Sequence, residues 1–245
     1  MKESAKKYSL QSAFTMLELV FVIVIVGILS ASIIPRMSSE PLYEAAIQLV
    51  SHIRYTQHLA LNDDKYDWEL NTANNEADWY QARWQLIFSK SVSTDGEYSY
   101  TIFSDASGKK TGNPDYTSLE QTEIARDPAN AKKLLSGGFS STFNWKNHYA
   151  NTNLNIGKTY GVIDLKLSGG CSNSRISFDH LGRPMRGDWA YQSSPYGALS
   201  YRRLIKYNTP CIITLKDTED IVKIQILPES GYTCILDNFG KCIKH

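Results

Sequence analysis

The chain has 245 residues, of which 42% are hydrophobic and 21% are charged, which is enough for one ordinary domain with its own core and an appendage. Its formal net charge of +1 at pH 7 gives no global case for a nucleic-acid-binding protein. The charges are unevenly placed, because residues 62–127 hold 13 acidic and 6 basic side chains whereas residues 128–245 hold 15 basic and 8 acidic ones. Such a distribution is consistent with oriented contacts in an assembly.

The N-terminal region joins a short polar segment to a long apolar one. Residues 1–13 carry three lysines, and residues 14–34 form a 21-residue apolar run in which Glu18 is the only charged residue. A helix of that length spans about 31 Å, enough to cross the hydrocarbon core of a bilayer. Lysines before such a helix favour a cytoplasmic N-terminus, so we expect the rest of the chain on the opposite side of the membrane.

Glu18 distinguishes two interpretations of this segment. An ordinary secretory signal would use residues 19–29 as its apolar region and Ser-Ala-Ser at residues 30–32 as its cleavage site, giving a secreted protein of unrelated function. That interpretation gives no reason for a carboxylate in the apolar run, which costs roughly 1–3 kcal/mol in a bilayer. Cleavage after Ala13 would provide a partner, because the new α-amino group of Phe14 is a cation. On this argument Glu18 has a reason to be there only if Phe14 becomes a free terminus.

Residues 13–18, AFTMLE, resemble the type III signal of type IV prepilins: a small residue, the cleavage point, Phe-Thr and a glutamate. Gly27 and Pro35 follow 13 and 21 residues after Phe14, at spacings where pilins commonly place helix-loosening residues. The family usually has glycine at the position of Ala13. The resemblance implies that a prepilin peptidase cleaves before Phe14 and methylates it. It also implies a structural subunit held in the inner membrane, with other pilins or pseudopilins as partners.

Residues 36–62 continue with helical periodicity. Apolar side chains recur at helical spacing at Leu42, Ala45, Ala46, Leu49, Ile53, Ala60 and Leu61. Pro35 and Pro41 each lack a backbone donor and should loosen or kink the entry. We predict one long, bent helix over residues 14–62, with residues 14–34 transmembrane and the second half packed on a head. Residues 49–61, LVSHIRYTQHLAL, resemble the corresponding helix of the GspH/FimT group of minor pilins and pseudopilins.

The remaining residues, 63–245, have the pattern of a β-rich periplasmic head. Residues 63–80 are polar and indicate a loop. Short runs with β character follow at residues 83–89, 98–103, 160–167, 175–178, 211–215, 221–227 and 232–236. Residues 105–157 are interpreted as an insertion, with a short helix near residues 128–135. The predicted fold class is α+β: a long N-terminal helix packed on an antiparallel sheet, as in pilins. Segments such as RWQLIF and ESGYTCI extend the GspH/FimT resemblance into the head.

A cluster of basic side chains lies between residues 181 and 207, with tyrosines and a tryptophan interleaved. Its members are Arg183, Arg186, Arg202, Arg203 and Lys206. Guanidinium groups for phosphates and aromatic rings for stacking favour sequence-tolerant DNA binding. Residues 182–186, GRPMR, loosely resemble the Gly-Arg segments of FimT-like minor pilins implicated in DNA uptake. The alternatives are a solvated loop and a patch that docks on the acidic face of a neighbouring subunit.

The cysteines lie in the last third of the chain: Cys171, Cys211, Cys234 and Cys242. In an exported domain an even number of cysteines indicates disulfides, here two with three connectivities open. We prefer Cys234–Cys242, because the segment between them contains turn-forming Asp, Asn and Gly residues. Cys171–Cys211 would then be the second bond.

Catalytic motifs do not stand out. The sequence has no His-Glu-x-x-His, no Gly-x-Ser-x-Gly and no phosphate-binding glycine loop. Asp179-His180 indicates a tight turn rather than part of a catalytic triad. Asp217, Glu219 and Asp220 could hold a calcium ion, as in some pseudopilins, but three acids in a hairpin are more often a solvated turn. We therefore expect a structural subunit that is not an enzyme and needs no cofactor.

Overall fold

The computed structural model describes residues 15–33, 40–63, 65, 79–106, 111–171, 174–187 and 203–243. The chain divides into two compact units, Met1–Glu40 and Pro41–His245. The first unit contains helix α1 (Met16–Ile33), and the second begins with helix α2 (Pro41–Asn62). Both helices lie within the span predicted to be helical. Residues 34–39 lie outside the described residues, so the predicted continuity through Pro35 stays a prediction.

The described part of the head contains two antiparallel sheets of four strands each. The first sheet has the order β2-β1-β4-β5 and contains β1 (Trp84–Lys90), β2 (Tyr98–Ser104), β4 (Arg175–Phe178) and β5 (Pro184–Arg186). The second has the order β3-β6-β7-β8 and contains β3 (Asp164–Gly169), β6 (Cys211–Lys216), β7 (Ile221–Ile226) and β8 (Thr233–Ile235). The α+β class is confirmed, with two sheets where one was expected.

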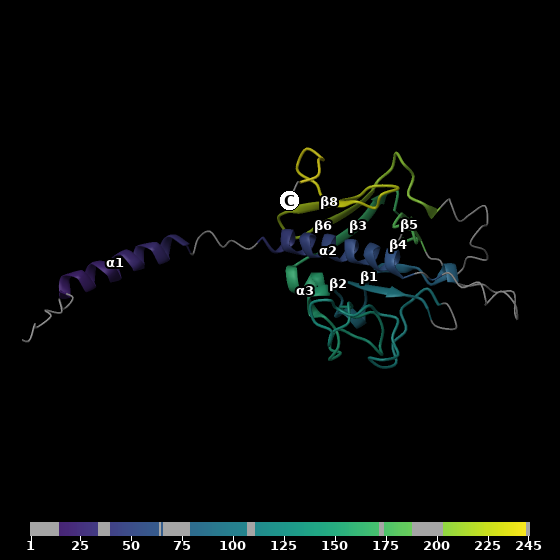
Figure 1. Cartoon of the computed structure of the whole chain (residues 1–245), viewed down its shortest axis with the longest axis horizontal. Helices are drawn as coiled ribbons and strands as arrows, with labels where there is room; N and C mark the ends of the chain where they lie inside the picture. Colours follow the sequence, from purple (N-terminus) through teal and green to yellow (C-terminus); the bar gives the residue numbers. More distant parts are fainter. Residues whose placement is uncertain are drawn as a thin grey trace, which may run out of the picture. The chain divides into compact units, whose positions relative to one another are not determined.

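Helix α2 lies between the two sheets and forms the centre of the head. Figure 1 shows it with β6 and β8 on one side and β1 and β2 on the other. Its buried side chains form one stripe: Leu42, Ala45, Ala46, Leu49, Val50, Ile53, Thr56 and Ala60. Three alanines in this stripe let the backbone approach the strands closely. The large buried side chains of both sheets complete the same core, so α2 is a structural part of the head.

The insertion covers the free edge of β2. The backbone N–H of Ile102 donates to Leu135 O (2.9 Å), and the N–H of Ala125 donates to Ile102 O (2.9 Å). An exposed strand edge invites pairing with other chains, and these bonds protect it. The insertion also has its own small core, made of Ile124, Leu134, Phe143 and Ala150. Short 3₁₀ helices lie at η3 (Trp79–Gln81), η4 (Val92–Thr94) and η5 (Thr152–Leu154).

Two segments differ from the sequence predictions. The run at residues 160–167 was predicted to be a strand, but its first residue closes helix α3 (Ile156–Tyr160). The Asn155 side chain caps that helix, and Gly161 ends it in a left-handed conformation (φ 73°), so the strand begins only at Asp164. The helix predicted near residues 128–135 is a tight turn. There Asp127 accepts the backbone N–H groups of Ala129 and Asn130, which gives the backbone an alternative to a helix.

Disulfides join Cys171 to Cys211 and Cys234 to Cys242. The first bond links the segment after β3 to the start of β6, next to the paired residues Gly169 and Cys211. The second closes an eight-residue separation into a C-terminal loop, in which the Asp237 side chain accepts the N–H groups of Phe239 and Lys241. The preferred connectivity is confirmed.

Candidate assembly helix and surfaces of the head

Glu18 and Thr15 cap the N-terminus of α1. The hydroxyl of Thr15 accepts a hydrogen bond from the backbone N–H of Glu18 (3.3 Å), and Glu18 Oε2 accepts one from the backbone N–H of Thr15 (3.2 Å). This reciprocal arrangement is a capping box, and it satisfies two N–H groups that have no partner inside the helix. The carboxylate also lies at the positive end of the helix dipole.

The capping box corrects the argument from the sequence. The capping box gives Glu18 a structural role at this position that does not require a free amino group on Phe14. The signal was readable, since Thr-x-x-Glu before an apolar run is the sequence pattern of a capping box. Because both hydrogen-bonding groups lie after position 14, cleavage before Phe14 would leave the cap intact.

The surface of α1 is apolar around its circumference. Its large apolar side chains between Met16 and Leu29 are 51–86% exposed. The hydroxyl of Ser30 donates to Val26 O (2.7 Å), so this polar group is satisfied within the helix. A Cβ added at Gly27 would meet nothing within 4 Å. A helix of this kind needs apolar surroundings.

None of the helices in the described ranges combines the length and apolar character needed to cross a membrane. Four predicted site residues lie outside those ranges: Ala13, Phe14, Pro35 and Arg202.

The described members of the basic cluster do not form one open cationic surface. The backbone N–H and the Nε of Arg183 both donate to the Asp179 carboxylate, at 2.8 and 2.7 Å. The Asp179 side chain is only 3% exposed, so this ion pair fixes the predicted tight turn at residues 179–182. Arg203 is partly buried and its Nη1 donates to Arg186 O (3.4 Å). Lys206 is exposed.

The acidic residues after β6 form a hairpin turn. Asp217 Oδ1 accepts the backbone N–H groups of Glu219 (2.8 Å) and Asp220 (2.7 Å). These backbone hydrogen bonds, with the one from Asp220 first, lower the pKa of the Asp217 carboxyl. The predicted hairpin is confirmed by the register from Lys216↔Ile221 to Cys211↔Ile226. Within the described residues, no three His, Cys, Asp or Glu side chains are grouped so that they could hold a metal ion.

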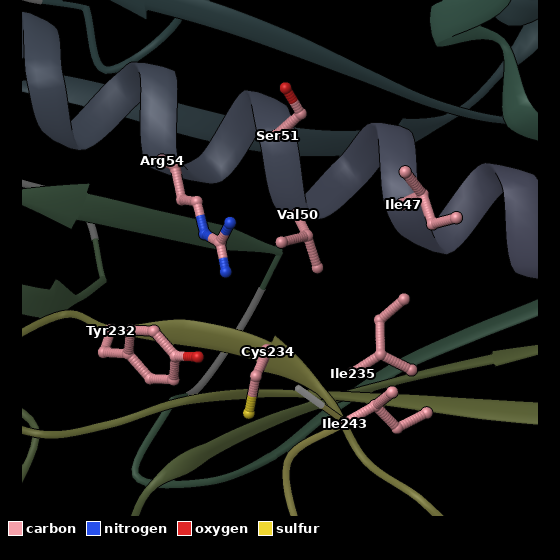
Figure 2. A pocket seen from close by; sticks show the side chains of 8 residues that line it. All are labelled: Ile47, Val50, Ser51, Arg54, Tyr232, Cys234, Ile235 and Ile243. Carbon is pink, nitrogen blue, oxygen red and sulfur yellow. The ribbon is translucent and has the colours of Figure 1, made fainter. Parts of the chain in front are cut away.

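A groove of about 310 Å³ lies between α2 and the C-terminal segment (Figure 2). Its lining residues are Ile47, Val50, Ser51 and Arg54 on the helix and Tyr232, Cys234, Ile235 and Ile243 opposite. Arg54 is engaged, because its Nη2 donates to Thr233 O (2.7 Å) and its guanidinium lies 5.6 Å from the centre of the Tyr232 ring. The lining places no His, Asp or Glu side chain beside the Ser51 hydroxyl, and its apolar side chains suit a packing contact.

His52 belongs to a hydrogen-bond chain that ties α2 to β2 and α3. Its Nδ1 lies 2.7 Å from the hydroxyl of Tyr100, which also accepts a hydrogen bond from Gln48 (2.8 Å). The hydroxyl of Tyr160 donates to the same Gln48 side chain (2.8 Å). Burial raises the pKa of Tyr100 and lowers the pKa of His52, which favours a neutral imidazole accepting from the phenol. The chain is a structural connection inside the head.

No protein-family model, curated protein or solved structure matches this chain.

Proposed function

We propose that this chain is a structural minor pilin or pseudopilin of a type IV pilus, type II secretion or competence machine. A prepilin peptidase would cleave it between Ala13 and Phe14, and the helix that starts there would hold it in the inner membrane with the head in the periplasm. Assembly would then carry this helix from the bilayer into a bundle of similar helices contributed by other subunits.

The observation that carries the proposal is the exposed apolar surface of α1. The side chains from Met16 to Leu29 need apolar surroundings, which a bilayer or a bundle of like helices supplies. The head, in contrast, is complete in itself, because α2 fills its core between the two sheets. Two disulfides favour an oxidising compartment for the head. A filament subunit is expected to have these two parts: an exposed apolar helix for assembly and a head with a complete core of its own.

Two roles of Glu18 can be separated with a matched pair of variants. Glu18→Gln keeps an oxygen that accepts the Thr15 N–H but removes the charge, whereas Thr15→Ala removes the reciprocal cap and keeps the charge. If Glu18 pairs with the Phe14 amine of a neighbour, Glu18→Gln should be cleaved normally but incorporated about tenfold less, the equivalent of roughly 1.4 kcal/mol. Thr15→Ala should assemble almost as well as the wild type, because the lost cap weakens the helix by about 1 kcal/mol both in the membrane and in the filament and this cost largely cancels.

The measurement is the fraction of processed protein recovered in sheared filaments, or crosslinked to neighbouring subunits, against the fraction left in the membrane. Normal incorporation of Glu18→Gln together with poor incorporation of Thr15→Ala would show that Glu18 acts only as a helix cap. That result would contradict the charge-pairing mechanism.

A further inference from the structure

A second cavity lies on the outer face of the first sheet, away from α2. Its volume is about 650 Å³, within the usual range for small-molecule sites. Its floor includes Ile87 and Ser89, which alternate along β1 with the core residues Leu86 and Phe88 and therefore point to the opposite face. Its walls come from two turns of the insertion, at residues 113–116 and 139–142.

Each of the two turns contributes an aromatic side chain to the cavity, and packing holds both in place. The ring of Tyr116 meets that of Phe143 edge to face at 4.7 Å, and Phe139 stacks on Phe143 at 5.7 Å with an interplanar angle of 18°. Phe143 itself is fully buried in the core of the insertion. Tyr116 and Phe139 thus reach the cavity from a fixed support, and little conformational freedom is lost when a ligand packs against them.

The rest of the lining offers uncharged hydrogen-bonding groups. Asn113 and Thr142 are exposed at the rim, and the hydroxyls of Ser140 and Thr142 lie 2.9 Å apart. Asp115 is the one charged side chain among the lining residues, all of which are described. A phosphate or carboxylate ligand would meet no cation there, and a quaternary ammonium would leave the hydroxyl and amide groups unused.

We propose that this cavity binds a neutral sugar ring. A pyranose has an apolar C–H face that can pack on Tyr116 and Phe139, and hydroxyls that can reach Asn113, Asp115 and Thr142. The insertion thereby has a second role besides covering the edge of β2, because two of its turns contribute to the cavity. The inference is independent of the proposed assembly function, since none of its residues belongs to α1.

The test is saturation-transfer NMR on the full-length chain in a detergent without a sugar headgroup. The probes are the methyl glycosides of glucose, galactose, mannose and N-acetylglucosamine, and tetramethylammonium is the competing class. We expect saturable binding of at least one glycoside with a Kd of about 1 mM or tighter. Phe139→Ala should weaken it about tenfold, and Asn113→Ala, at an exposed position, about threefold. Tyr207→Ala, an exposed aromatic that does not line the cavity, is the matched control and should bind normally.

Three results would overturn the proposal: no transfer from any glycoside at about 10 mM, equal binding in Asn113→Ala and the wild type, or binding of tetramethylammonium alone. Once binding is established, co-sedimentation with insoluble peptidoglycan, measured with and without soluble dextran as a competitor, distinguishes a wall-bound saccharide from a free one.

Discussion

His52 illustrates how a single side chain can make the head sensitive to acid. Its ring packs edge to face on Tyr100 at 5.7 Å, and its Nδ1 faces the Tyr100 hydroxyl at 2.7 Å. Burial is the main cause of its lowered pKa, with the Asp127 charge opposing it. A protonated ring would turn Nδ1 into a donor facing a phenol that already accepts from Gln48. The neutral imidazole is therefore the form that the folded head stabilises.

The pH dependence of stability follows from this shift. The pKa of His52 in the folded head lies below the unfolded value of about 6.5. The contribution of the neutral ring to the free energy of unfolding is therefore fully present above about pH 6.5. It is lost as the pH falls through the folded pKa, because the unfolded chain then binds the additional proton. We expect the Tm of the wild type to fall more steeply below about pH 6.5 than that of His52→Gln. Thermal unfolding of both proteins between pH 5 and 8 checks this, and parallel curves would contradict it.

Among individual residues, the sequence identified the cysteine pairs and the turn at Asp179, whereas the capping box at Glu18 was not predicted. Asp237, Asn238 and Gly240 predict a tight loop from local chemistry alone, and such signals are readable because their partners are close in sequence. The ion pair between Arg183 and Asp179 is equally local, at a separation of four residues, but the sequence pattern did not predict it. Its buried partner removes much of the charge that a phosphate would need.

One face of helix α2 packs between the two sheets. Two isoleucines, one on this face and one outside it, allow a direct comparison. Ile53 is 1% exposed between the sheets, whereas Ile47 is 46% exposed beside the groove. Ile53→Ala should destabilise the head by about 2–5 kcal/mol through lost burial and a cavity. Ile47→Ala should cost less than about 1 kcal/mol. Chemical denaturation of the two variants measures the difference, and equal losses would contradict the placement of α2 in the core.

The strands show which elements can be predicted from sequence. The runs at residues 83–89, 98–103 and 175–178 lie within one residue of β1, β2 and β4, because alternating apolar side chains mark each strand locally. The division into two sheets was not predicted, since it depends on pairings such as β3 with β6, whose partners are 42–52 residues apart in the sequence. The insertion lacked periodicity for a related reason. Its backbone hydrogen bonds join isolated positions, some to β2 and others within the insertion, such as Leu134 N–H to Tyr149 O, and they do not follow a regular strand.

At the scale of the whole molecule, the described residues form a head with a closed core and an apolar helix whose large side chains are exposed. The chain divides at Glu40, and the head beyond it needs nothing from the first unit to complete its core. The sequence predicted one long helix over residues 14–62 that packs its second half on a head of residues 63–245, whereas the structure includes that half, as α2, in the head. The apolar helix would mediate assembly, and the surfaces of the head would make the contacts that are specific to this subunit.

The central claim is that the chain is cut before Phe14, and the N-terminus of the mature protein tests it most directly. Intact-mass and N-terminal peptide analysis should be carried out on protein expressed with and without a prepilin peptidase. We predict an N-methylated Phe14 as the first residue when the peptidase is present and an uncut chain when it is absent. A mature protein that starts at Ile33, as an ordinary signal peptide would give, would contradict the account.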